Sequence, residues 1–117
     1  MGKLTTHILD TAHGKPAGAV RIDLFVARGG QWHALGSAHT NADGRCDAPL
    51  LEGEELQPGR YRLVFHIGAY FRGLGAALVE PAFLDEVPLE FGVADAAAHY
   101  HVPLLVSPWS YSTYRGS

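Results

Sequence analysis

The sequence predicts an all-β sandwich, and three observations lead to this fold class. Short segments alternate apolar and polar residues with the period of two that places side chains on opposite faces of a strand. Turns rich in glycine and proline separate these segments at fairly even spacing, and a helical period is nearly absent. A count of about seven or eight strands with one short helix is typical of two packed sheets.

The first expected strands are residues 4–10 and 20–28, which flank a Gly/Pro loop. In residues 4–10 (LTTHILD), Thr5 and His7 share one face, and apolar side chains occupy much of the other. Residues 20–28 (VRIDLFVAR) alternate clearly, so we expect one face of this strand in the core. That face carries Val20, Ile22, Leu24 and Val26.

In the middle of the chain, residues 31–40 form a further expected strand and Asp43-Gly44 a tight turn, because glycine takes positive φ at little cost. Residues 60–68 (RYRLVFHIG) alternate more strongly than any other segment. Residues 69–77 favour one short helix, which two glycines weaken.

The last expected strands are residues 87–94, 99–107 and 109–116. Pro103 cannot donate a hydrogen bond to a neighbouring strand, so we expect it at a sheet edge or a bulge. Residues 109–116 are polar on both faces. Such a strand lies in solvent, pairs with another chain, or lines a pocket.

Length and composition predict one domain over residues 1–117. A net charge of −3 indicates neither nucleic acid nor an anionic membrane as a partner. The single cysteine, Cys46, excludes an internal disulfide, and the N-terminal residues lack the apolar stretch of a secretory signal. We therefore expect a cytoplasmic protein.

The chain has seven histidines, and most are expected at the surface. His99 and His101 lie two residues apart and so share a strand face, which could support a metal site. Without a cysteine pair or carboxylate motif this is a weak metal signature. The histidines expected at the surface are His13, His33, His39 and His66, the last of them exposed or packed at a subunit contact.

No serine-hydrolase elbow, phosphate-binding loop or dinucleotide motif occurs, and Cys46 has no evident catalytic partner. Four regions remain as a possible site: His7, Arg45, His101 and residues 114–117. Spacing permits these regions to meet but does not bring them together.

Three segments resemble the 5-hydroxyisourate hydrolases, the transthyretin-related enzyme family of purine catabolism. They are residues 4–17 (LTTHILDTAHGKPA), residues 40–45 (TNADGR) and residues 99–117 (HYHVPLLVSPWSYSTYRGS). The terminal YRGS is the most specific of these motifs, because transthyretin lacks it. The resemblance covers essentially the whole chain, with the motifs in family order.

The resemblance implies a transthyretin-like β-sandwich of two four-stranded sheets, with a short helix after the fifth strand. It also implies a homotetramer, a dimer of dimers around a central channel. The polar last strand would face that channel.

The resemblance further implies hydrolysis of 5-hydroxyisourate to 2-oxo-4-hydroxy-4-carboxy-5-ureidoimidazoline, with no metal and no organic cofactor. A water activated by His101 or His7 would attack a ring amide carbonyl, and which histidine is the base stays open. His99 is not among the implied site residues. The implied catalytic residues are His7, Arg45, His101 and Ser117. The implied substrate-binding residues are His7, Arg45, Tyr114, Arg115 and Gly116.

Two other functions remain open. A transthyretin-like carrier would hold small aromatic ligands in its channel without turning them over. A structural sandwich would use its last strand for oligomerisation alone. Turnover of 5-hydroxyisourate distinguishes the enzyme from both.

Overall fold

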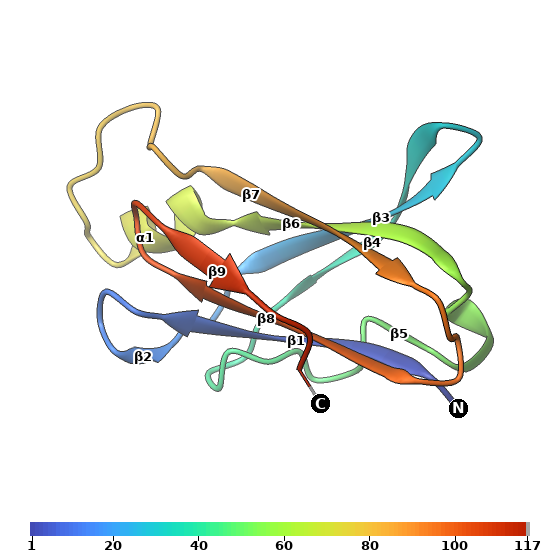
Figure 1. Cartoon of the computed structure of the whole chain (residues 1–117). Coiled ribbons are helices and arrows are strands. Elements are labelled where there is room, and N and C mark those ends of the chain that lie inside the picture. The colour runs from blue at the N-terminus through green and yellow to red at the C-terminus, as the bar shows by residue number, and fades with distance from the viewer. Residues whose placement is uncertain (117) are drawn as a thin grey trace.

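The computed structural model describes residues 1–116 and consists of two β-sheets packed face to face, with helix α1 (Ile67–Gly73) at one end (Figure 1). The five-stranded sheet has the order β2-β1-β8-β9, and β5 also pairs with β1. Its strands are β1 (Lys3–Asp10), β2 (Lys15–Pro16), β5 (Leu51–Glu52), β8 (His99–Val106) and β9 (Tyr111–Thr113). The four-stranded sheet comprises β4 (Gln31–His39), β3 (Arg21–Arg28), β6 (Gly59–His66) and β7 (Glu86–Val93), in that order.

The predicted sandwich with one short α-helix is confirmed. The first sheet has one strand more than expected, because the two-residue β2 pairs with the end of β1. Helix α1 begins at Ile67, two residues before the expected start, and ends at Gly73. Gly75 has φ +84°, which is incompatible with a continuing helix, so the helix is shorter than predicted. Within residues 1–116, no helix combines the length and apolar character that crossing a membrane requires.

The core lies between the sheets and is built from the apolar positions of the alternating strands. All the inward positions expected from residues 20–28 are buried, as are the alternate apolar residues of β6. On β1, Leu4 and Ile8 are fully buried, whereas Thr5 and His7 are only partly buried on the other face. The period-two pattern therefore identified the face of β1 that the core does not use.

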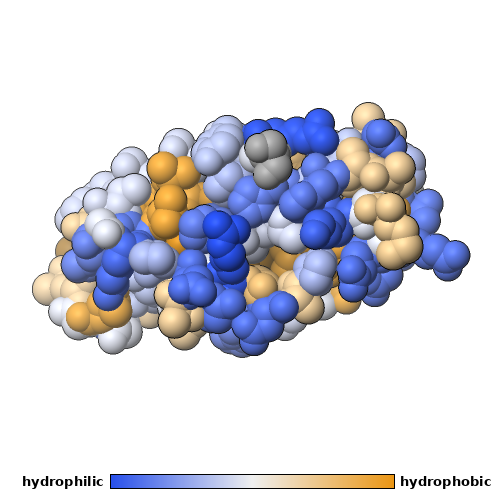
Figure 2. Space-filling view, turned by 90° about the horizontal axis from the view of Figure 1, so that it is seen from below, coloured by the Kyte–Doolittle hydropathy of each residue, from blue (hydrophilic) through white to orange (hydrophobic). Residues whose placement is uncertain are grey.

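Strands β1 and β8 run parallel, although they come from opposite ends of the sequence. Their register places Thr5 beside His101 and His7 beside Pro103. The outer face of this sheet thus collects polar side chains from both ends of the chain. Seen from this side of the sandwich, the molecule has a mostly hydrophilic surface with scattered hydrophobic patches (Figure 2).

The prediction that Pro103 lies at an edge or bulge is wrong, because β8 is flanked by β1 and β9. Strand β9 pairs with Leu104–Val106, and a separate bridge joins His101 to Gly116. Pairing on the β9 side is interrupted at Pro103, so a residue without an N–H is tolerated there. As expected, every residue of β9 is exposed.

Candidate active site

The turn after β4 carries Arg45 to the first strand. The Asn41 side chain accepts a hydrogen bond from the Arg45 backbone N–H at 3.2 Å, which closes this turn. Gly44 has φ +75°, and its carbonyl accepts a hydrogen bond from Ile8 at 2.8 Å. A side chain at position 44 would lie 2.4 Å from the Ile8 carbonyl oxygen, so this close approach requires glycine. As a result, Arg45 forms a β-bridge with His7.

The His7 imidazole is held by the same turn. Its Nε2 lies 3.1 Å from the Asp43 carbonyl oxygen, which can only accept, so Nε2 carries the hydrogen. Burial and the positive charge of Arg45 lower the pKa of His7 below its ordinary value, against an opposing effect of Asp43. His7 is therefore mainly neutral at pH 7, with Nδ1 unprotonated.

His101 projects from the adjacent strand and is also kept neutral. Burial lowers its pKa most, and Arg45, His99 and His7 lower it further through their charges. The Thr5 hydroxyl oxygen lies 2.7 Å from His101 Nδ1 and 2.8 Å from His99 Nε2. A neutral imidazole beside a guanidinium can take up a proton from water, as a general base requires.

A cavity of about 300 Å³ lies between these side chains. Burial and the neighbouring Asp47 raise the pKa of the Cys46 thiol at its wall, so this thiol stays protonated and is a poor nucleophile. No group of three or more His, Cys, Asp or Glu residues within residues 1–116 is arranged to hold a metal ion. The cavity is lined by Thr5, Thr6, Arg45, Cys46, Ala48, His99 and His101.

The C-terminal segment packs directly against His101. The Gly116 N–H donates to the His101 carbonyl oxygen at 2.8 Å, and a Cβ at position 116 would lie 2.6 Å from His101 Cδ2. The Arg115 guanidinium lies 4.1 Å from the centre of the Tyr100 ring and donates to the His99 carbonyl oxygen at 3.4 Å. These contacts fix the segment beside the imidazole, and the fit requires glycine at position 116.

The predicted site residues thus fall into three groups. The structure brings His7, Arg45 and His101 together, with Gly116 packed on the last of these. Tyr114 and Arg115 line a separate, largely apolar cavity of about 220 Å³ beside β7. Ser117 lies outside the described residues.

Sequence reasoning missed the contacts of Thr5 and His99 with His101. The sequence does place Thr5 on the same strand face as His7. It does not show which strand pairs with this one, or in which register, so the contact with His101 could not be predicted. Of the histidines expected at the surface, His66 is partly buried, and its Nε2–H donates to Asp23 at 2.8 Å. His13 makes a similar 2.7 Å bond to Asp10.

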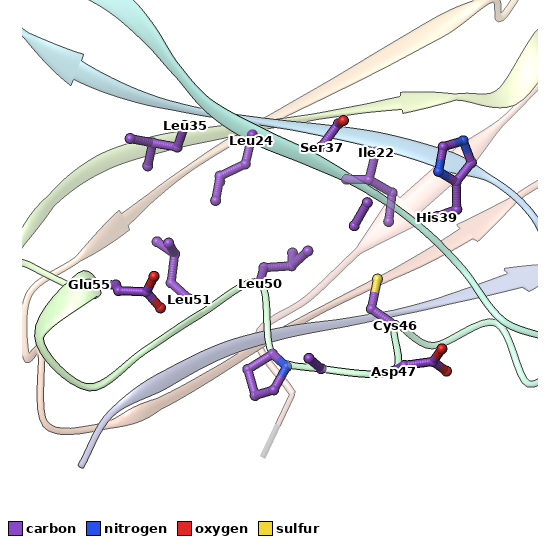
Figure 3. Close-up of a pocket in the computed structure, with 14 residues that line it drawn as sticks. Ile22, Leu24, Leu35, Ser37, His39, Cys46, Asp47, Leu50, Leu51 and Glu55 are labelled. Carbon is purple, nitrogen blue, oxygen red and sulfur yellow. The ribbon is translucent and has the colours of Figure 1, made fainter.

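A larger cavity, of about 440 Å³, lies between β4 and residues 46–55 (Figure 3). Leu24 and Leu35 project into it from one side, and Leu50 and Leu51 from the other. Cys46 contributes to both cavities, but neither His7 nor His101 reaches this one.

Comparison with known proteins shows the family to which the chain belongs. The family model described as HIUase/Transthyretin family matches residues 4–116. The 5-hydroxyisourate hydrolase of Ralstonia nicotianae is 62% identical over 117 residues, which is 100% of both chains. The solved structure of Klebsiella pneumoniae 5-hydroxyisourate hydrolase superposes with a TM-score of 0.80 at 37% identity, covering 100% of both chains.

Sea bream transthyretin, solved in complex with thyroxine, has a TM-score of 0.86 at 28% identity and covers 97% of this chain and 94% of its own. The fold is thus shared by enzymes and a protein solved with thyroxine, and both hydrolases named above are more similar in sequence to this chain than the transthyretin is. With the family model spanning nearly every residue, the chain belongs to the HIUase/Transthyretin family.

Proposed function

We propose that this chain is a single-domain 5-hydroxyisourate hydrolase that produces 2-oxo-4-hydroxy-4-carboxy-5-ureidoimidazoline. The observation that carries the proposal is one cavity that combines an exposed guanidinium with an imidazole of lowered pKa. The names of relatives at 57% and 62% identity over the full chain support the same activity.

In the proposed reaction, His101 removes a proton from a water molecule as that water attacks the ring amide carbonyl. His101 is better placed than His7, because it lines the cavity and its neutral form is favoured by three neighbours. The new C–O bond gives a tetrahedral intermediate. The C–N bond then breaks, the protonated imidazole returns its proton to the leaving nitrogen, and the ring opens to a carboxylic acid, which loses its remaining proton to solvent.

Arg45 serves as the electrophilic partner in this proposal. Its planar fork of donors matches the carbonyl groups of a ureide and stabilises the negative charge that develops on the attacked oxygen. His7, which bridges to Arg45 on β1, has an unprotonated Nδ1 available to accept a hydrogen bond from substrate or water.

The remaining proposed roles belong to the C-terminal segment. Gly116 lets the chain lie against the His101 ring. Tyr114 and Arg115 line the separate cavity beside β7 rather than the one at His101, so their proposed part in substrate binding is to hold the C-terminal segment beside that ring. Ser117 would orient the attacking water or relay a proton. We further propose a cytoplasmic homotetramer, a dimer of dimers, in which the exposed β9 faces a central channel. No metal or organic cofactor takes part in this reaction.

The alternative is a carrier that binds small aromatic molecules, a function favoured by the likeness to transthyretin in complex with thyroxine. A carrier, however, gains nothing from two neutral histidines beside an arginine. Mixing the protein with freshly generated 5-hydroxyisourate and following ultraviolet absorbance separates the two functions.

We expect the full chain to accelerate loss of substrate well beyond spontaneous decay. A matched chain that ends at Thr113 should bring the rate close to the spontaneous one, because it lacks the contacts of residues 114–116 with β8. Equal decay with and without the full chain would contradict the enzyme and favour the carrier.

A further inference from the structure

Thr5 has no part in the reaction as described, yet its hydroxyl touches two imidazoles. The oxygen lies 2.7 Å from His101 Nδ1 and 2.8 Å from His99 Nε2. The parallel register of β1 and β8 sets Thr5 directly opposite His101, with both residues partly buried on the same sheet face. The bridge therefore follows from the backbone and does not depend on a flexible loop.

A hydroxyl has one hydrogen to donate and lone pairs to accept. If the Thr5 hydroxyl bonds both rings, it donates to one nitrogen and accepts an N–H from the other. Two arrangements satisfy this rule. In the first, Thr5 donates to His101 Nδ1, and the neutral His101 carries its hydrogen on Nε2. In the second, His101 Nδ1–H donates to Thr5, Thr5 donates to His99 Nε2, and His101 Nε2 has a free lone pair.

The second arrangement suits a base and the first does not. A proton from water must reach an imidazole nitrogen with a free lone pair, and His101 Nε2 has no hydrogen-bond partner among residues 1–116. Once His101 is protonated, both of its nitrogens carry hydrogen. Nδ1–H then still donates to Thr5, so the bridge is kept in both protonation states. In the first arrangement, proton uptake would occur at Nδ1 and would break the bond to Thr5.

We propose that Thr5 is a positioning residue that holds His101 in the tautomer with its hydrogen on Nδ1 and fixes the orientation of the ring. His99 is the hydrogen-bond acceptor at the far end of the bridge, which gives this histidine a role other than metal binding. The inference rests on the proposed function, because it concerns how the base of that reaction is prepared.

The test compares Thr5→Val, which keeps the shape and removes the hydroxyl, with Thr5→Ser, which keeps the hydroxyl. Thr11→Val is the matched control: Thr11 directly follows β1 and its hydroxyl also bonds to β8, at the Val106 carbonyl oxygen 3.1 Å away, but it lies away from the cavity. We expect Thr5→Val to lower kcat about 10- to 100-fold with little change in KM, the size of one lost hydrogen bond to a charged group. Thr5→Ser and Thr11→Val should remain close to wild type.

Nitrogen-15 NMR of the imidazoles shows which nitrogen of His101 carries the hydrogen. If Thr5 had only a structural role, the Thr5→Val substitution would leave this tautomer unchanged. In the wild-type protein we expect His101 to carry its hydrogen on Nδ1, and in Thr5→Val the hydrogen should shift toward Nε2. A wild-type His101 with its hydrogen on Nε2 would overturn the proposal without any variant, even if Thr5→Val failed to fold. Equal loss of kcat in Thr5→Ser and Thr5→Val would overturn it as well. Failure of the proposed function can be told apart from failure of this inference. If the function is wrong, the wild-type protein will not turn over 5-hydroxyisourate, whereas the tautomer of His101 can still be measured.

Discussion

Two cavities share the Cys46 side chain and differ in chemistry as well as in size. The larger one lies between β4 and residues 46–55, and its wall includes four leucines but, within residues 1–116, no arginine (Figure 3). The smaller one, on the outer face of β1 and β8, contains an arginine and two imidazoles joined through a hydroxyl. Cavity volume alone would therefore point away from the proposed active site.

The contrast has a structural origin. The larger cavity forms where two elements run past each other without strand pairing, since β5 pairs with β1 and β4 is an edge strand. The smaller one forms where parallel pairing and two β-bridges set the backbone positions of His7, Arg45 and His101. Two of these residues, His7 and His101, have lowered pKa values, and such shifts mark a functional site better than empty volume does.

The largest effect is expected from replacing the proposed base. His101→Asn should lower kcat/KM by about 100- to 10,000-fold, because asparagine fills similar space but cannot take a proton from water. His39→Asn is the matched control, as His39 is exposed and lines the larger cavity. Steady-state kinetics with thermal unfolding to check stability provides the measurement. Near-normal turnover of folded His101→Asn would remove this residue from the mechanism.

A smaller loss is expected from Gly116→Ala. The added Cβ would lie 2.6 Å from His101 Cδ2, so the ring or the segment must shift, and misplacing a catalytic group by about 1 Å costs on the order of 100-fold in rate. Gly92→Ala provides the comparison, because a Cβ there meets no atom within 4 Å. If both variants kept the wild-type rate, the C-terminal segment would have no influence on His101.

The pH dependence of turnover should follow the lowered pKa values of His7 and His101. A base acts only when neutral, so kcat/KM should be level near pH 7 and fall only as the pH drops below the ordinary histidine pKa of about 6.5. Arg45→Met removes a positive charge that lowers both pKa values, so the acidic limb should move upward. Arg45→Lys keeps the charge and should leave the limb in place, although its rate falls with the loss of the planar fork. Identical limbs in all three proteins would contradict this electrostatic coupling.

The smallest effect is expected in the larger cavity. Ser37→Ala removes an exposed hydroxyl from its wall, and we expect unchanged turnover with a change in unfolding free energy within about 0.5 kcal/mol. Urea unfolding together with the absorbance assay tests this expectation. A clear loss of activity in the folded Ser37→Ala protein would mean that both cavities serve the reaction.

Much of the fold follows from local pattern, and most of the site does not. Alternation in residues 20–28 and 60–68 predicts both the strands and their buried faces. This is possible because every second residue of a strand points to the core, so the pattern can be read within a short stretch of sequence. The approach of Arg45 to His7 instead depends on how a turn packs against a strand 38 positions away in the chain. The family resemblance selected these residues, whereas strand periodicity could not bring them together.

The Thr5 bridge was beyond sequence reasoning for the same reason. Its two bonds exist because β1 and β8 pair in one register, and a slip by one residue would turn Thr5 to the other face. The wrong placement of Pro103 has a related cause. Nothing in the sequence around it shows that pairing with the C-terminal segment is interrupted there.

The parallel pairing of β1 with β8 has a consequence for how the molecule reaches its working state. Thr5 and His101 are 96 positions apart, so bringing them together closes a long loop at a high entropic cost. Contacts between such distant segments form slowly compared with hairpins such as β3–β4. Catalytic competence should therefore be acquired late, after most secondary structure is present. In a refolding experiment, the rate at which turnover returns would report the rate at which β8 pairs with β1.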